Sequence, residues 1–111
     1  MDERTRRLAG NEAIFREVNE RIQGAARGHG EDGHLYEYVC ECSRTGCTDL
    51  VALTIDEYED LRALPDRFAL VAGHELPDIE RIVAEVRPGT LAVEKLGAAA
   101  DEALRRDPRA A

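Results

Sequence analysis

The stretch "LYEYVCECSRTGCTDLVALT", residues 35–54, carries the clearest structural pattern in this sequence of 111 residues. Its first eight residues alternate and include Tyr and Val, which favours a β-strand over 35–42. Its last six residues, "DLVALT", predict a second short strand over 49–54. The polar segment "CSRTGC" between them has the composition of a turn. We therefore expect a β-hairpin whose long turn carries cysteines.

The segments that follow this hairpin predict more of an antiparallel sheet. "TIDE" at 54–57 fits a capping box, with Thr54 as the cap of a helix that ends before Pro65. "RFALVAG" at 67–73 predicts a third strand. Residues 79–86 fit a helix or a strand, but the turn residues Pro88 and Gly89 come next. We expect a β-hairpin over 80–96, preceded by a single helical turn.

Helical patterns lie at both ends of the chain. Residues 2–27 predict an amphipathic helix whose apolar stripe faces the core, and Asn11 fits the cap of a helix that begins there. The stripe consists of Ile14, Phe15, Val18, Ile22 and Ala25. "GAAADEALRRD" at 97–107 predicts a closing helix. We expect one α+β domain over 1–111, with a small antiparallel sheet flanked by N- and C-terminal helices and with frayed ends at 1–10 and 107–111.

Composition limits the classes of partner. The chain has 15 basic and 23 acidic residues, and its net charge of −8 opposes binding to nucleic acid. Residues 1–20 lack the apolar centre of a signal peptide, and no apolar run approaches the length of a membrane span. We expect a cytoplasmic protein without a membrane partner, in which thiols stay reduced. Aromatic residues make up 5% and Trp is absent, so a metal ion would usefully stabilise so small a core.

Three cysteines within eight positions predict a metal site that needs one more ligand. Cys40 and Cys42 fall on the same face of an extended segment, and Gly46 allows the turn to bring Cys47 back to them. Of the three histidines, His34 would lie about 20 Å from Cys40 along one strand. His29 stays open as a ligand, since it belongs to the Gly-rich segment 28–34.

We choose His74 as the fourth ligand because it follows a predicted strand and Gly73 directly. Three thiolates and one imidazole in a tetrahedral array are typical of a structural Zn²⁺ site. The sequence therefore predicts zinc bound by Cys40, Cys42, Cys47 and His74.

Other interpretations of the cysteines stay open. The alternative function is a thiol-based redox or metal sensor that uses Cys40, Cys42 and Cys47. A Cys42–Cys47 disulfide with Cys40 free would suit the redox form, although the neighbouring acidic residues Glu41 and Asp49 do not favour thiolates. The cysteines would also fit as small buried residues. A zinc enzyme is the least favoured interpretation, because strand alternation turns Glu41 away from the cysteines and the sequence contains neither the His-x-Glu nor the Cys-x-x-Cys arrangement of a zinc deaminase.

Four blocks of the sequence resemble a family of small uncharacterised actinobacterial proteins. The blocks are "NEAIFREVNERI", "CEC" with a third Cys, "LTIDEYEDLRALPDRFALVAGHE" and "VEKLGAAADEALRRDPR", in that order. The resemblance extends from Asn11 to Arg109 and supports the same three cysteines and His74, and it implies no particular activity. We expect a zinc-stabilised regulatory module that acts by binding another protein.

Overall fold

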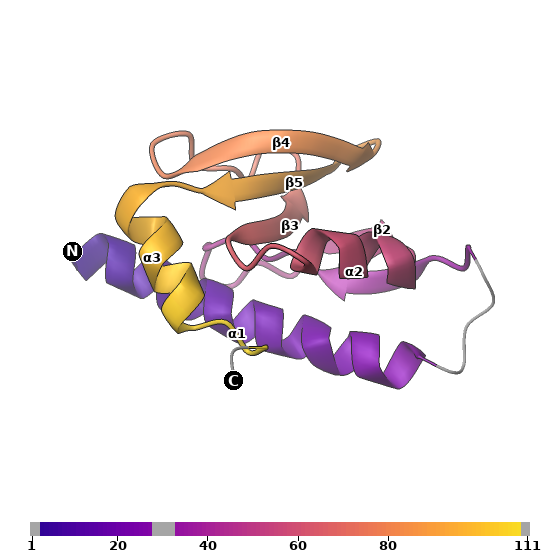
Figure 1. Cartoon of the computed structure of the whole chain (residues 1–111). Coiled ribbons are helices and arrows are strands. Elements are labelled where there is room, and N and C mark those ends of the chain that lie inside the picture. Colours follow the sequence, from indigo (N-terminus) through magenta and orange to yellow (C-terminus); the bar gives the residue numbers. More distant parts are fainter. Residues whose placement is uncertain (1–2, 28–32, 110–111) are drawn as a thin grey trace.

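The computed structural model describes residues 3–27 and 33–109, with the backbone alone at Thr5. These residues form an α+β fold of three helices and two small antiparallel sheets, as predicted (Figure 1). The elements are α1 (Glu3–Ala26), β1 (Tyr36–Val39), β2 (Leu50–Leu53), α2 (Ile55–Arg62), β3 (Arg67–Val71), β4 (Glu80–Arg87), β5 (Thr90–Lys95) and α3 (Gly97–Arg105). None of the described helices is both long enough and apolar enough to cross a membrane.

The cysteine hairpin forms the first sheet. β1 pairs antiparallel with β2, and the register places Tyr36 opposite Leu53 and Val39 opposite Leu50. β1 is shorter than predicted and ends at Val39, just before the first cysteine. The chain then runs beside β3, where the Glu41 N–H donates to the Ala69 carbonyl at 2.8 Å. The start of the cysteine turn therefore links the two sheets.

The second sheet has the strand order β3-β5-β4 and contains the predicted hairpin over 80–96. Gly89 has a φ of +82°, which the turn between β4 and β5 requires and which a glycine adopts without strain. The capping box of α2 is confirmed: the Thr54 hydroxyl accepts from the Glu57 N–H, and the Glu57 carboxylate accepts from the Thr54 N–H. The predicted C-terminal helix is present as α3.

Helix α1 differs from the prediction in its start and in the face that it buries. It already begins at Glu3, and Asn11 lies inside it. The predicted apolar stripe is wrong for most of its length, because Ile14 is 61% exposed and Val18 is 39% exposed, although Ile22 is half-buried and packs against the core. The buried stripe consists of Ala9, Glu12, Arg16, Asn19, Gln23 and Ala26. These inward polar side chains meet backbone carbonyls and charged groups that need hydrogen-bond partners, so this helix docks through its polar face.

The C-terminal end is also held more firmly than predicted. Asp107 forms ion pairs with the buried Arg62 and, at 3.9 Å, with Arg16. Arg109 binds the Glu59 carboxylate at 2.8 and 3.0 Å. Residues 107–109 are therefore attached to α1 and α2 by charged contacts.

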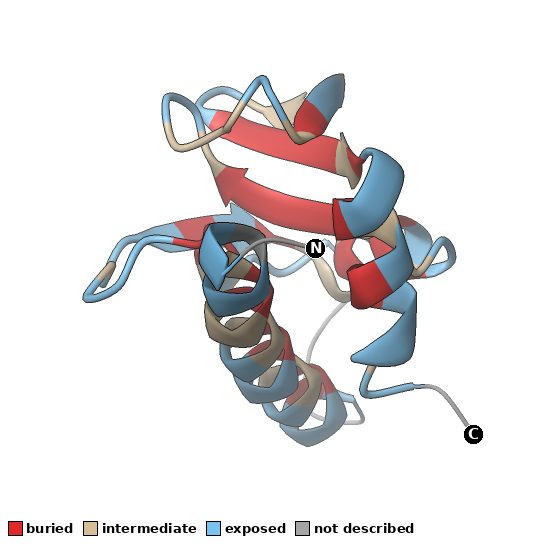
Figure 2. Ribbon diagram, turned by 90° about the vertical axis from the view of Figure 1, so that its left-hand side faces the viewer, coloured by how far each residue is buried: buried red, intermediate tan, exposed pale blue. Residues whose placement is uncertain are grey.

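The core has two apolar clusters, one on each face of β3. Phe68 and Leu70 belong to one cluster, together with Cys40 and Cys42, while Ala69 belongs to the other. This division follows from the alternation of side chains along a strand. Buried residues are concentrated in β3 and β5 of the second sheet, whereas most of β4 and most of the outer helix surface are exposed or half-buried (Figure 2). Two of the three cysteines are thus built into the core.

Candidate metal centre

The turn between β1 and β2 brings three cysteines together. The Cys40 N–H donates to the Asp49 carbonyl at 3.0 Å, which closes the base of the turn. The Cys47 N–H donates to the Arg44 carbonyl at 3.2 Å, and Gly46 adopts a φ of +81°. This tight, glycine-dependent return carries Cys47 back towards the first two cysteines.

A second turn, directly after β3, places His74. Its N–H donates to the Val71 carbonyl at 3.0 Å, and Gly73 has a φ of +96°. Glu75 accepts the Gly73 N–H at 2.7 Å, so this carboxylate is held within its own turn. The Arg44 guanidinium donates to the Gly73 carbonyl at 3.1 Å and ties the two turns together. Residues 27 or more positions apart thereby meet at one corner of the molecule.

The donor atoms of Cys40, Cys42, Cys47 and His74 all lie within 4.8 Å of one another. His74 Nδ1 is 3.5 Å from Cys40 Sγ and 3.8 Å from Cys47 Sγ. Tetrahedral coordination with a Zn–S bond of about 2.3 Å and a Zn–N bond of about 2.0 Å separates sulfur from nitrogen by about 3.5 Å. The cluster therefore has the spacing that one metal ion requires.

Asp49 orients the imidazole and was not expected from the sequence as part of the site. Its carboxylate lies 3.3 Å from His74 Nε2, on the ring edge opposite the sulfurs. An N–H at Nε2 that faces this carboxylate leaves the lone pair of Nδ1 directed at the three thiols. Histidine ligands of metals commonly have such a partner. In the sequence, the only signal that Asp49 could orient His74 was its position two residues after Cys47.

The local environment suits bound thiolates better than free ones. Burial raises the pKa of Cys40 to about 12 and also raises the pKa of Cys42. Without a metal these thiols stay protonated at neutral pH, which opposes a redox centre that depends on a reactive thiolate. The Val71 N–H donates to Cys40 Sγ at 3.2 Å, a contact that favours negative charge on sulfur once a metal displaces the proton. All three cysteines are free of disulfides.

His34 and Glu41, two other titratable residues named from the sequence, lie outside the cluster. The ring of His34 packs against Tyr36, with 4.5 Å between centroids, and His29 lies outside the described residues. Glu41 is fully buried and turned away from the sulfurs, as strand alternation predicts. Its carboxylate accepts hydrogen bonds from Asn19, Tyr58 and the Ala69 N–H. These three bonds join residues far apart in the chain and were not predicted from the sequence.

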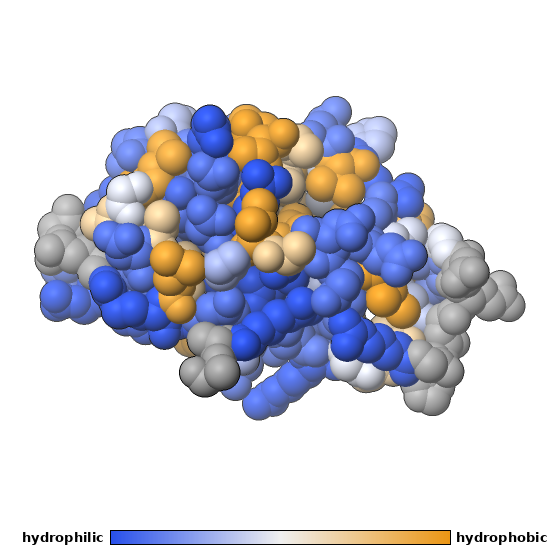
Figure 3. All heavy atoms as spheres, in the orientation of Figure 1, coloured by the Kyte–Doolittle hydropathy of each residue, from blue (hydrophilic) through white to orange (hydrophobic). Residues whose placement is uncertain are grey.

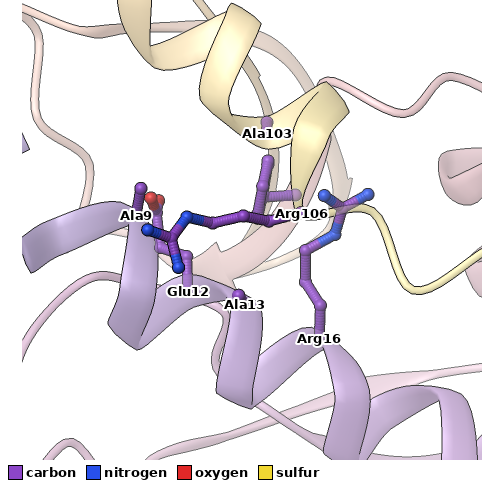
Figure 4. Close-up of a pocket in the computed structure, with 7 residues that line it drawn as sticks. Ala9, Glu12, Ala13, Arg16, Ala103 and Arg106 are labelled. Carbon is purple, nitrogen blue, oxygen red and sulfur yellow. The ribbon is translucent and has the colours of Figure 1, made fainter. Parts of the chain in front are cut away.

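Two hollows elsewhere on the molecule do not involve the cluster. One lies between α1 and α3, and the side chains of Glu12, Arg16 and Arg106 project into it (Figure 4). Its volume of about 10 Å³ is room for about one water molecule. A shallower hollow of about 210 Å³ lies between α2 and the second sheet. Neither hollow is lined by any of the four clustered residues.

Comparison with known proteins assigns no family to this chain. No protein-family model, no curated protein and no solved structure matches it. The resemblance to the actinobacterial group stays a prediction, and function must be argued from the site alone.

Proposed function

We propose that this chain is a zinc-binding protein in which Cys40, Cys42, Cys47 and His74 hold one structural Zn²⁺. The observation that carries this proposal is the spacing of the four donor atoms, all within 4.8 Å, with His74 Nδ1 turned towards the sulfurs. Soft thiolates with one imidazole favour zinc over magnesium or calcium, which prefer oxygen ligands.

A structural role is favoured over a catalytic one. Four protein donors complete a tetrahedron, whereas catalytic zinc keeps one position open for water or substrate. The nearest carboxylate, Asp49, faces the far nitrogen of His74 and so serves to orient the ligand. A bound zinc ion would stabilise the fold strongly, since zinc-finger peptides gain on the order of 10–16 kcal/mol from their metal.

The biological role that we propose is that of a small cytoplasmic regulatory module that binds another protein. The net charge of −8 supports a protein partner over nucleic acid. On the face drawn in Figure 3, apolar residues form separate patches within a mostly hydrophilic surface. Small apolar patches of this kind suit a transient partner better than an obligate one.

Metal analysis of purified protein tests the zinc proposal. We expect about one zinc ion per chain, retained under mild oxidation, and a His74→Ala variant with at least tenfold lower zinc affinity. His34→Ala is the matched control and should bind zinc like the unchanged chain. A metal-free protein with a Cys42–Cys47 disulfide in its peptide map would overturn the proposal in favour of the thiol-based sensor. Full zinc affinity in His74→Ala would show that the fourth ligand is another group.

A further inference from the structure

We propose that the metal centre and helix α1 stabilise each other, and that Glu41 is the positioning residue that connects them. Glu41 lies between two of the ligands in the sequence and contacts none of the sulfurs. The inference rests on the proposed function, because it concerns how metal binding at the same site is energetically coupled to the docking of α1.

The carboxylate of Glu41 is fixed by three separate elements. It accepts from Asn19 Nδ2 of α1 at 2.9 Å, from the Tyr58 hydroxyl of α2 at 2.7 Å, and from the Ala69 N–H of β3 at 2.9 Å. The side chain is fully buried. A buried carboxylate with three donors is costly to displace, because each donor would lose its partner.

This anchor sets the direction of the two neighbouring cysteines. Successive side chains of an extended segment point to opposite sides, so an inward Glu41 turns Cys40 and Cys42 together to the other side. On that side the Val71 N–H donates to Cys40 Sγ at 3.2 Å. Residues 40–42 are therefore bound to β3 through Glu41 on one side and Cys40 Sγ on the other, and these contacts hold the segment without involving the ion.

Helix α1 holds the ligand segment at two further points. Asn19 brackets the backbone of Val39, donating to its carbonyl and accepting from its N–H, each at 2.8 Å. These two bonds hold the backbone in place directly before Cys40. Within the turn, Asn11 Nδ2 donates to the Ser43 carbonyl at 2.9 Å and to the Thr45 hydroxyl at 3.1 Å.

The consequence is a reciprocal coupling. A metal ion that orders residues 40–47 presents these acceptors to α1 in one fixed arrangement, which favours helix docking. By linkage, a docked α1 must raise metal affinity by the same factor. Removal of the metal should therefore weaken the docking of α1 on the side that faces the cysteine turn.

Gln23 provides a matched control on the same helix. Like Asn19 it is buried, at 2% exposure, and belongs to the inward polar stripe. It donates to the Ile55 carbonyl at 3.0 Å and to Glu59 at 3.1 Å, and it accepts from the Tyr38 hydroxyl of β1 at 2.5 Å, so none of these three bonds reaches residues 40–47. Removing Gln23 weakens the attachment of α1 to β1 and α2 but removes no direct contact to residues 40–47.

The experiment measures zinc affinity by competition with a chromogenic chelator, using the full chain and its Asn11→Ala, Asn19→Ala, Glu41→Gln and Gln23→Ala variants. We expect Asn19→Ala and Glu41→Gln to lower affinity by about tenfold or more, in the range known for residues that support metal ligands. Asn11→Ala, a half-buried site whose change should leave the fold intact, should lower it about threefold. Gln23→Ala should lower the melting temperature but keep zinc affinity within about twofold.

Two spectroscopic readouts separate positioning from general stability. Glu41→Gln should change the visible absorption bands of bound Co²⁺, whereas Gln23→Ala should leave them unchanged. Chelation should speed amide hydrogen exchange in residues 9–20 of α1. Two results would overturn the coupling. One is an equal loss of zinc affinity in Asn19→Ala and Gln23→Ala, and the other is amide hydrogen exchange in α1 that does not change on chelation.

The outcomes also distinguish this inference from the proposed function. If the unchanged chain binds no metal, the proposed function fails and the coupling fails with it. If it binds Co²⁺ with a tetrahedral spectrum while Asn11→Ala and Asn19→Ala bind equally well, only the coupling is wrong.

Discussion

Two polar centres border the same apolar cluster, and they balance charge in different ways. The metal centre contributes Cys40 and Cys42 to the cluster that contains Phe68. The second centre, called here the ionic centre, consists of Glu12, Glu80 and Lys95. Lys95 Nζ contacts both carboxylates and lies 4.9 Å from the centroid of the Phe68 ring.

The difference between the centres lies in the source of the positive charge. In the ionic centre the chain supplies it through Lys95, its only lysine. In the metal centre the proposed function requires this charge from a bound ion, because four ligands converge there and the thiols must lose their protons to bind it. The metal centre should therefore respond to a chelator, and the ionic centre only to pH or mutation.

Chelation is the change with the largest expected effect. We expect EDTA to lower the unfolding free energy by several kcal/mol, because structural zinc contributes on the order of 10 kcal/mol in small domains and whole domains are stable by only about 5–15 kcal/mol. Thermal unfolding followed by circular dichroism, with and without EDTA, measures this, and added Zn²⁺ should restore the original curve. An unchanged melting temperature in EDTA would mean that the two centres do not differ as proposed.

The metal centre shows how much of a site can be predicted from sequence. The spacing of Cys40, Cys42 and Cys47, and the place of His74 after a strand and a glycine, pointed to four groups that do meet in the structure. Each of these residues lies in a turn whose local chemistry is visible in the sequence. Asp49 was not predicted as a partner of His74, because that contact depends on how two distant turns meet.

The ionic centre and helix α1 show what could not be predicted. Glu12 lies outside the apolar stripe predicted for α1, which included Ile14, but Glu12 is buried and Ile14 is exposed. Hydrophobic periodicity assumes that a helix docks on an apolar surface. This one docks on backbone carbonyls and on the buried Lys95, so the inward face had to be polar. No local pattern reveals such partners.

Lys95→Met should produce the next largest effect. Methionine keeps much of the side-chain volume but leaves the carboxylates of Glu12 and Glu80 buried without their cation. Breaking a buried ion pair in this way typically costs about 3–5 kcal/mol, and urea unfolding of metal-loaded protein measures it. The control is Arg81→Met, which removes an ion pair with Glu94 at 3.0 Å whose arginine is 64% exposed. That loss should stay below about 1 kcal/mol, and equal losses would show that the ionic centre contributes no more than a surface pair.

The pH dependence of stability gives the smallest effect and the sharpest test of the ionic centre. Burial raises the pKa of Glu12 from 4.5 to about 7, although Lys95 opposes this shift. Between these values the folded chain holds a proton that the unfolded chain has released, so the contribution of Glu12 to stability falls as pH rises through this window. The Glu12→Gln variant has no titrating group at this position. The unfolding free energy of the unchanged chain, measured relative to that of the variant, should therefore decline by up to about 1.4 kcal/mol per pH unit. The decline should end above the pKa of Glu12 in the folded chain. Urea unfolding of both proteins at several pH values measures the difference, in which the metal contribution cancels because both chains carry the same cysteine corner.

Glu85→Gln, at an exposed position of β4, should give a curve parallel to that of the unchanged chain. If Glu12→Gln also runs parallel, Glu12 stays ionised beside Lys95, and both centres would then hold full charge within the core at neutral pH.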